Sequence, residues 1–302
     1  MIQLDKIKNR VEKEIFTPIL CLQELEEGVM NYTYELTTKY RQYILKINPI
    51  GRDNISIKES NAIKICNNYK INVPQLLICH KSDSIIENSF LLYKKLEGTS
   101  LNHIYKALNA SEIEKITTQL SSHFNIISSI NLPLAGDTID FKKFTNQSWQ
   151  DFLLQEIDGG IDFLIKNKIS TVDKIDNLRK QLENDVNKLE LKESCFVWAD
   201  FDPSNIIIDT NLNFNGFIDF EGVISGDPEY ALGCFIAKYG YDTFSSMLIG
   251  KLDCNIKKLD LYAIIRYLRL IKYSNDKLPT GKKRDEIKDF LPYAYNLTNH
   301  LL

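Results

Sequence analysis

The chain has 302 residues, which suits one large domain or two moderate ones, and its 44% hydrophobic share is ample for a globular core. Its 37 basic and 40 acidic residues give a formal net charge of −3, so nothing favours nucleic acid as a partner. The chain has no apolar run of membrane-spanning length, no apolar signal-peptide core and no Cys-x-x-Cys pair among its six cysteines. We therefore expect a cytoplasmic protein with reduced core cysteines, no membrane partner and no structural zinc.

The first hundred residues have the patterns of short strands and two helices. Helices are expected at 3–15 and at about 55–69, because apolar side chains recur there at helical spacing. The expected strands are 21–25, 32–36, 43–47, 76–79 and 89–94.

Lys46 lies inside the third strand, and Glu59 follows thirteen residues later on the second helix. A lysine at a sheet edge would need no special reason, but a strand lysine that pairs with a helix glutamate can position nucleotide phosphates. The turn at 26–31 contains Gly28 and Asn31 and could cover those phosphates with backbone N–H groups, although a plain hairpin explains it equally well.

After Gly98 the patterns are mainly helical. Ser111 with Glu114 has the spacing of a capping box, and Gly159-Gly160 can break the helix that contains it. The expected helices are 100–108, 111–130, 149–166, 171–191, from Pro228 to about 250, 256–274 and 291–302.

Three polar residues stand out in the apolar stretch 195–230. Asn205 follows Asp200 by five residues, and Asp219 follows Asn205 by fourteen. Residues 205–209 and 217–220 read as two strands joined by a turn, so a hairpin would bring Asn205 and Asp219 to the same end. The Asp200 carboxylate can accept a hydroxyl proton, while an amide oxygen and a second carboxylate are ligands that suit Mg²⁺. The spacing therefore predicts phosphoryl transfer.

This stretch resembles the catalytic loop and metal-binding segment of the kinase-like small-molecule phosphotransferases, which include aminoglycoside phosphotransferases and choline kinases. The family pattern is His-Gly-Asp-x-x-Pro-x-Asn, then Ile-Asp-Phe/Trp, then Gly-Asp-Pro. It is matched by Trp198-Ala199-Asp200, Pro203, Asn205, Ile218-Asp219-Phe220 and Gly226-Asp227-Pro228. Trp198 replaces the family histidine and Ala231 replaces a family Asp. Both family residues brace the loop, and neither touches the metal or the transferred phosphate.

The resemblance implies an α/β (α+β), protein-kinase-like bilobal fold, with a nucleotide-binding lobe at 1–97 and a catalytic and substrate-binding lobe at 98–302. It implies Mg²⁺-dependent transfer of the γ-phosphoryl group of ATP or GTP to a hydroxyl group of a small molecule. Asp200 would be the catalytic base, and Asn205 and Asp219 would hold the metal. The implied nucleotide-binding residues are Gly28, Asn31, Lys46, Glu59 and the hinge residues Tyr93, Lys94 and Leu96.

The sequence does not identify the acceptor molecule. Candidate acceptor residues are the acids on the helix 149–166 together with Asp202 and Glu221, and they favour a cation, with aminoglycoside-like antibiotics first and choline-like amines second. The helix acids are Asp151, Glu156, Asp158 and Asp162. A solvated helix face explains them equally well, and sugars are an alternative acceptor class. A catalytically silent nucleotide-binding regulator is disfavoured, because none of the motif residues for metal, base or phosphate is missing.

Overall fold

The computed structural model describes residues 2–25, 31–144, 148–166, 168 and 171–275, with only the backbone of 271–275. The chain divides into two compact units. Unit 1 is built from Met1–Lys106, Ile139–Phe141 and Pro203–Glu221, and unit 2 from Ala107–Thr138, Lys142–Asp202 and Gly222–Leu302. The predicted boundary at 97/98 differs from this division, since the chain stays in unit 1 up to Lys106 and returns to it at Pro203.

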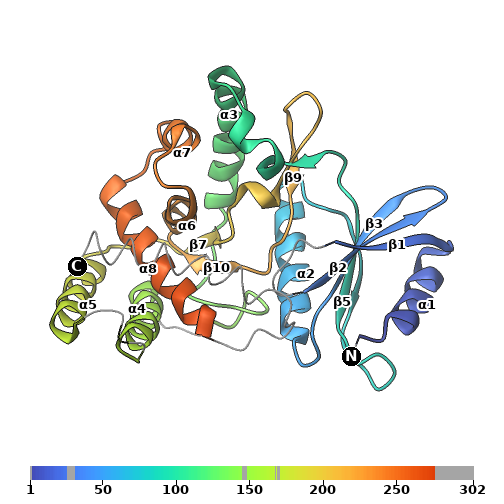
Figure 1. Ribbon diagram of the computed structural model, residues 1–302, viewed down its shortest axis with the longest axis horizontal. Coiled ribbons are helices and arrows are strands. Elements are labelled where there is room, and N and C mark those ends of the chain that lie inside the picture. Colours follow the sequence, from blue (N-terminus) through green and yellow to red (C-terminus); the bar gives the residue numbers. More distant parts are fainter. Residues whose placement is uncertain (1, 26–30, 145–147, 167, 169–170, 276–302) are drawn as a thin grey trace. The chain divides into compact units, whose positions relative to one another are not determined.

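Unit 1 contains a five-stranded antiparallel sheet with strand order β1-β2-β3-β5-β4. All five predicted strands are present, with ends shifted by a few residues. They are β1 (Ile19–Leu25), β2 (Tyr32–Thr38), β3 (Gln42–Ile47), β4 (Leu76–His80) and β5 (Phe90–Lys94). The two predicted helices are α1 (Leu4–Ile15) and α2 (Asp53–Asn68), and Figure 1 shows them on opposite sides of the sheet.

The alternation of β3 decides which of its side chains face each helix. Leu45 and Ile47 are fully buried in one apolar cluster with Ile7 and Val11 of α1. Lys46, between them, points to the other face and reaches Glu59 on α2. The strand therefore stabilises unit 1 through one face and presents a charged group on the other.

A second sheet explains why residues 203–221 belong to unit 1. Its strands are β6 (Thr99–Ser100), β8 (Ile206–Ile208) and β9 (Phe214–Phe217), in the order β6-β8-β9. Gly98 permits this pairing, because its φ is +115° and a Cβ there would lie 2.2 Å from the Ile208 carbonyl oxygen.

The predicted hairpin forms, although its second strand ends at Phe217 instead of 220. The Ile218 N–H donates to the Asn205 carbonyl oxygen at 2.9 Å, so the backbone segments that carry Asn205 and Asp219 do meet at one end of the hairpin. Asp219 itself lies beyond the strand, in the left-handed region with φ of 64°.

Unit 2 is mainly helical around a two-stranded antiparallel sheet that the sequence analysis did not predict, formed by β7 (Cys195–Trp198) and β10 (Val223–Gly226). Its α-helices are α3 (Ala110–Ser128), α4 (Trp149–Lys166), α5 (Val172–Asn187), α6 (Glu229–Tyr239), α7 (Thr243–Ile249) and α8 (Ile256–Asn275). Helix α4 packs against α5 and α8, and α6 also packs against α8. Helix α8 is thus central to the helical packing.

The predicted break at Gly159-Gly160 is wrong, because α4 runs through both glycines. A Cβ on Gly160 would lie 2.5 Å from the Cβ of Leu268, so this glycine lets α8 approach α4 closely. The helix predicted from Pro228 to about 250 is also wrong in one respect, since it is two helices, α6 and α7, separated at Gly240 with φ of 66°.

The expected helix at 100–108 is two short 3-10 turns, Leu101–His103 and Tyr105–Ala107. The capping box of α3 is formed by Asn109 and Glu112 rather than by the predicted pair Ser111 and Glu114. The predicted helix at 291–302 lies outside the described residues.

All six cysteines are free thiols, as predicted. Cys66, Cys195 and Cys234 are buried, whereas Cys21 and Cys79 are exposed, so the prediction of core cysteines is wrong for these two. Within the described part of the chain, no helix is long and apolar enough to cross a membrane.

Candidate active site

Unit 1 gathers three carboxylates around one lysine. The Nζ atom of Lys46 lies 2.9 Å from Oε2 of Glu59, 2.9 Å from Oδ1 of Asp219 and 3.2 Å from Oε2 of Glu221. Strand β3 supplies the lysine, α2 supplies Glu59, and the segment after β9 supplies the other two acids. The predicted pair of Lys46 and Glu59 is therefore present, and Glu221 joins this cluster, which the sequence analysis did not anticipate.

Burial and neighbouring charges determine the charge state of the Lys46 ammonium. Lys46 is 8% exposed and Glu59 is 2% exposed. Burial alone would lower the pKa of the Lys46 ammonium, but Asp219, Glu221 and Glu59 outweigh burial and hold that pKa well above its ordinary value. Burial raises the pKa of the Glu59 carboxyl, against the opposing effect of the Lys46 charge. Lys46 is thus a permanent cation.

The same acids fit a divalent metal. Glu59, Asp219 and Glu221 each offer a carboxylate oxygen, and the three oxygens lie within 4.8 Å of one another. One ammonium facing three carboxylates leaves an excess of negative charge, which a divalent cation would neutralise, and hard oxygen ligands suit Mg²⁺. The Asp219 side chain is the most accessible of the three, at 37% exposed. The Asp219 backbone has a left-handed conformation, which is uncommon for residues other than glycine.

Asn31, the last residue of the segment predicted to be a glycine-containing turn, contacts this cluster. Its Nδ2 atom donates to Oε2 of Glu221 at 2.6 Å, and the residue is 7% exposed. Gly28, the other predicted residue of the turn, lies outside the described residues. Asn31 therefore reaches an acid of the cluster from the segment that was predicted to cover phosphates.

The predicted hinge residues follow along β5 and beyond it. The Tyr93 side chain is buried, and burial followed by the Glu59 charge raises its pKa well above the ordinary value. Its ring thus belongs to the interior beside the lysine cluster, and its backbone pairs with Ile44 of β3 and Leu76 of β4, so recognition of a nucleotide base by this segment stays a prediction. The Lys94 N–H is bonded to the Gln75 carbonyl oxygen at 3.0 Å, and Leu96 is half-buried.

Asn205 ends a 3-10 turn, Pro203–Asn205, immediately before β8. The Ser100 hydroxyl lies 3.1 Å from the carbonyl oxygens of both Pro203 and Ser204 and so ties this turn to β6. The role of the Asn205 amide as a metal ligand stays a prediction.

In unit 2 the predicted base, Asp200, is bound by an arginine that the sequence analysis did not single out. Nη2 of Arg266, on α8, lies 2.9 Å from Oδ1 of Asp200. Gly222 borders the other carboxylate oxygen, since a Cβ there would lie 1.9 Å from Oδ2. Burial alone would lower the pKa of the Arg266 guanidinium, but Cys234 and Asp200 raise it above its ordinary value. One carboxylate oxygen of Asp200 therefore faces the Arg266 guanidinium, and the other lies against Gly222, which has no side chain.

The acids of α4 do not form one face. Glu156 is 8% exposed, and its Oε2 atom lies 3.8 Å from Nε of Arg269 on α8. Asp158 and Asp162 are exposed and lie 3.7 and 3.4 Å from Nη2 of Arg179 on α5. Only Asp151, in the first turn of α4, is simply an exposed acid.

Asp202, the remaining predicted acceptor residue, is also paired. It lies 2.6 Å from Nζ of Lys238, and the Tyr239 hydroxyl donates to it at 3.1 Å. The acids that motivated a cationic acceptor are thus largely neutralised by basic residues of their own unit.

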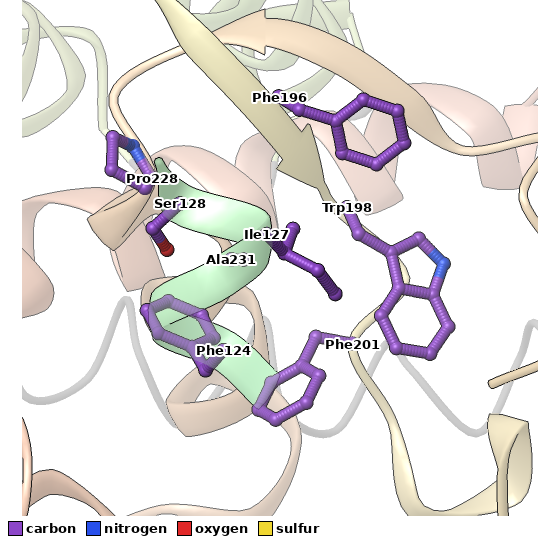
Figure 2. Close-up of a pocket in the computed structure, with 8 residues that line it drawn as sticks. All are labelled: Phe124, Ile127, Ser128, Phe196, Trp198, Phe201, Pro228 and Ala231. Atoms are coloured by element: carbon purple, nitrogen blue, oxygen red, sulfur yellow. The ribbon is translucent and has the colours of Figure 1, made fainter. Parts of the chain in front are cut away.

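Trp198 and Ala231, the two departures from the family pattern, line one small apolar cavity in unit 2. Trp198 is 2% exposed and packs edge-on against Phe201, with ring centroids 5.7 Å apart. Figure 2 shows Ile127 pointing toward both aromatic rings. The other residues of the lining are Phe124, Ser128, Phe196 and Pro228. Side-chain packing therefore supports the segment that carries Asp200.

Asp227, of the Gly-Asp-Pro motif, stabilises the same region. Its Oδ1 atom accepts the Glu229 N–H at 3.0 Å at the start of α6. Its Oδ2 atom accepts from the Tyr262 hydroxyl at 2.9 Å, and that hydroxyl accepts from Nε1 of Trp149 at 3.0 Å. This buried network links α4, α6 and α8.

Replacing Trp198 with His should lower the melting temperature while keeping measurable activity, because a buried ring is lost but no group at Asp200 is removed. Truncating a buried aromatic costs up to about 3–5 kcal/mol. Thermal denaturation followed by circular dichroism measures the effect, and Tyr40→His, at a residue that is 72% exposed, is the control. Complete inactivation of a variant that melts normally would contradict this packing role.

Comparison with known proteins agrees with this geometry. The profile of the phosphotransferase enzyme family matches residues 22–253. No curated protein sequence matches the chain.

Several solved structures share the fold. One is a thermostable mutant of aminoglycoside phosphotransferase APH(4)-Ia in complex with AMP-PNP and hygromycin B. Its TM-score is 0.74 at 15% identity, over 98% of this chain and 97% of that one. A GDP complex of a mutant aminoglycoside 2'-phosphotransferase-IIIa has a TM-score of 0.72 at 15% identity, over 97% of both chains. A complex of APH(2")-IIa with streptomycin and ATP has a TM-score of 0.65 at 20% identity, over 96% of this chain and 97% of that one.

The fold is thus the protein-kinase-like fold of the aminoglycoside phosphotransferases, with a β-rich unit 1 and a helical unit 2. The family profile covers well over half of the sequence, including the lysine cluster and Asp200. The chain therefore belongs to the phosphotransferase enzyme family and is a phosphotransferase with a hydroxyl group as its acceptor.

Proposed function

We propose that the protein transfers the γ-phosphoryl group of ATP or GTP to a hydroxyl group of a small molecule in a Mg²⁺-dependent reaction. The observation that carries the proposal is the buried Lys46, whose ammonium lies within 3.2 Å of Glu59, Asp219 and Glu221. A lysine fixed by a helix glutamate beside a metal-binding aspartate is the arrangement that kinases use to align nucleotide phosphates.

Each group has a distinct proposed role on the nucleotide side. Lys46 contacts the α- and β-phosphates, and Glu59 holds its ammonium in place. Asp219, Asn205 and Glu221 supply oxygen ligands to Mg²⁺, which neutralises charge on the phosphates when it is bound. Asn31 approaches from the turn, and the backbone from Tyr93 to Leu96, including Lys94, reads the base.

Asp200 acts on the acceptor. Its carboxylate orients the hydroxyl and takes its proton as the hydroxyl oxygen bonds to the γ-phosphorus. The bond from that phosphorus to the bridging oxygen breaks, and the nucleoside diphosphate leaves with the bonding electrons. The products are a phosphate monoester and ADP or GDP.

ATP and GTP are both candidate phosphoryl donors. Of the structurally similar proteins, one holds AMP-PNP, another ATP and a third GDP. Two of them hold the aminoglycosides hygromycin B and streptomycin. Aminoglycosides are therefore candidate acceptors, but the pairing of Glu156 with Arg269 and of Asp202 with Lys238 weakens the original motive for a cation.

The proposed metal site is tested by the binding of AMP-PNP with and without Mg²⁺, measured by titration calorimetry. Asp219→Ala removes a charged ligand, so the gain in affinity on adding Mg²⁺ should fall by about 10-fold or more, the scale of losing a charged hydrogen-bonding or metal-bound group. Asn205→Ala should have a milder effect, because a neutral ligand is lost.

Asp83→Ala serves as the matched control, because Asp83 is an exposed acid of the same unit that accepts the N–H groups of Ile85 and Ile86 and lies 3.7 Å from Nε2 of His80. It should leave the Mg²⁺ effect unchanged. An unaltered Mg²⁺ effect in both Asp219→Ala and Asn205→Ala would refute the metal site.

A further inference from the structure

The surroundings of Asp200 carry an inference about the acceptor, which rests on the proposed function. Arg266 lies 2.9 Å from one oxygen of the Asp200 carboxylate, and Gly222 borders the other. All three residues belong to unit 2. A hydroxyl that donates its proton to Asp200 must therefore bind beside the Arg266 guanidinium.

The guanidinium changes the charge that an acceptor meets. Its positive charge offsets the negative charge of Asp200, so the pair attracts a cation far less than a lone carboxylate would. Arg266 also stays charged at any working pH, because an arginine guanidinium does not lose its proton in proteins. An ammonium group next to the target hydroxyl would be repelled by this arginine.

The neighbouring acids do not compensate. Glu156 is buried against Arg269, and Asp202 is bound by Lys238 and Tyr239. Asp158 and Asp162 lie at the α5 side of α4, near Arg179. Among the acids that were predicted to bind a cation in unit 2, only Asp151 has no such basic neighbour within the described residues.

Arg266 also offers hydrogen bonds. A guanidinium has five N–H donors in a planar fork, and Asp200 engages Nη2. The side chain remains 16% exposed, so part of it can be reached from solvent. Hydroxyl or other oxygen atoms that flank the target hydroxyl are suitable acceptors for the remaining donors.

We infer that Arg266 is a specificity-determining residue, and that the acceptor is an oxygen-rich polyhydroxyl compound without a positive charge next to the phosphorylated hydroxyl. Sugars and other polyols fit this chemistry. Compounds whose target hydroxyl is flanked by ammonium groups do not.

The test compares matched acceptors that differ only in one hydroxyl replaced by an amine: glucose with glucosamine, galactose with galactosamine, and glycerol with 3-aminopropane-1,2-diol. Hygromycin B, streptomycin and choline are added as cationic acceptors. The full chain is assayed with Mg²⁺ and either ATP or GTP, and kcat/KM is measured for each acceptor. The wild-type protein should favour the neutral member of a pair by about 10-fold or more, as expected for like charges in close proximity at a partly buried site.

Two substitutions separate charge from folding. Arg266→Gln removes the charge and should shrink the preference to less than about threefold, whereas Arg266→Lys keeps the charge and should retain it. Because the preference is a ratio within each variant, a general loss of activity does not affect it. Arg179→Gln, which alters a peripheral arginine beside Asp158 and Asp162, should leave both rates and ratios unchanged.

The possible failures are distinguishable. A wild-type preference for amino or cationic acceptors, or an Arg266→Lys variant that loses the neutral preference, would overturn this inference while the phosphotransferase proposal stands. An unchanged preference in an active Arg266→Gln variant would do the same. Turnover of no acceptor by the wild-type protein would overturn the proposed function, and this inference with it.

Discussion

Replacing Asp200 with Asn should lower kcat by about 10²-fold or more, the scale expected when a positioned base is removed. The amide oxygen can still accept from Arg266, so the substitution removes the base without leaving the guanidinium unpartnered. The affinity for AMP-PNP should change little, because the proposed nucleotide contacts are made by other residues. Steady-state kinetics and titration calorimetry measure the two quantities separately.

Asp185→Asn is a suitable control for this substitution, because Asp185 is an acid of α5 whose side chain is 42% exposed and lies 3.5 Å from Lys188. It should retain normal turnover and normal nucleotide binding. Near-normal kcat in Asp200→Asn would remove this carboxylate from the chemistry.

Replacing Lys46 with Met should lower kcat/KM for the nucleotide by about 10²–10³-fold, the range measured when one charge-stabilising donor is removed from an active site. The substitution also leaves Glu59 buried without its cation, which typically costs about 3–5 kcal/mol of stability. Urea denaturation should therefore detect a large loss of unfolding free energy alongside the kinetic defect.

A double variant separates these two effects of Lys46. Lys46→Met with Glu59→Gln removes the uncompensated charge, so the free energy of unfolding should largely recover while kcat/KM stays low. Lys6→Met is the control, since Lys6 is an exposed lysine of α1 that donates to the Ile85 carbonyl oxygen at 3.0 Å elsewhere in unit 1. Recovery of activity together with stability would mean that Lys46 acts only on folding.

The sequence could predict those parts of the site that lie on regular elements or within one short segment. The alternation of β3 places Lys46 on the face opposite Leu45 and Ile47, and helical spacing places Glu59 on the neighbouring helix. Asn205 and Asp219 lie at the two ends of one short hairpin, so their spacing alone was sufficient to predict that the backbone segments that carry them meet.

Local sequence patterns could not predict contacts between segments that lie far apart in the chain. Arg266 lies 66 residues from Asp200, and nothing in the spacing of α8 selects that acid as its partner. Glu221 was predicted to be an acceptor residue, but its Oε2 atom lies 3.2 Å from Nζ of Lys46, which is 175 residues away in the sequence.

The acids of α4 illustrate a second limit of sequence analysis. Glu156 and Asp158 were assigned to one acidic helix face, yet one lies against α8 and the other near α5. Helical periodicity gives the angle between two side chains, but it does not reveal which neighbouring helix brings an arginine to each. Gly160 was misjudged for the same reason, since the close approach of Leu268 cannot be seen in the sequence.

The central claim is that phosphate passes from the nucleotide to an acceptor hydroxyl, and the most direct measurement follows the phosphate itself. The full chain is incubated with Mg²⁺, ATP or GTP labelled with ³²P at the γ-position, and the panel of sugars, polyols, aminoglycosides and choline, and labelled esters are separated from labelled nucleotide and inorganic phosphate. The account predicts a labelled phosphate monoester with at least one acceptor, and its loss in Asp200→Asn. Nucleotide binding with no labelled ester from any acceptor, or equal labelling by Asp200→Asn, would contradict it.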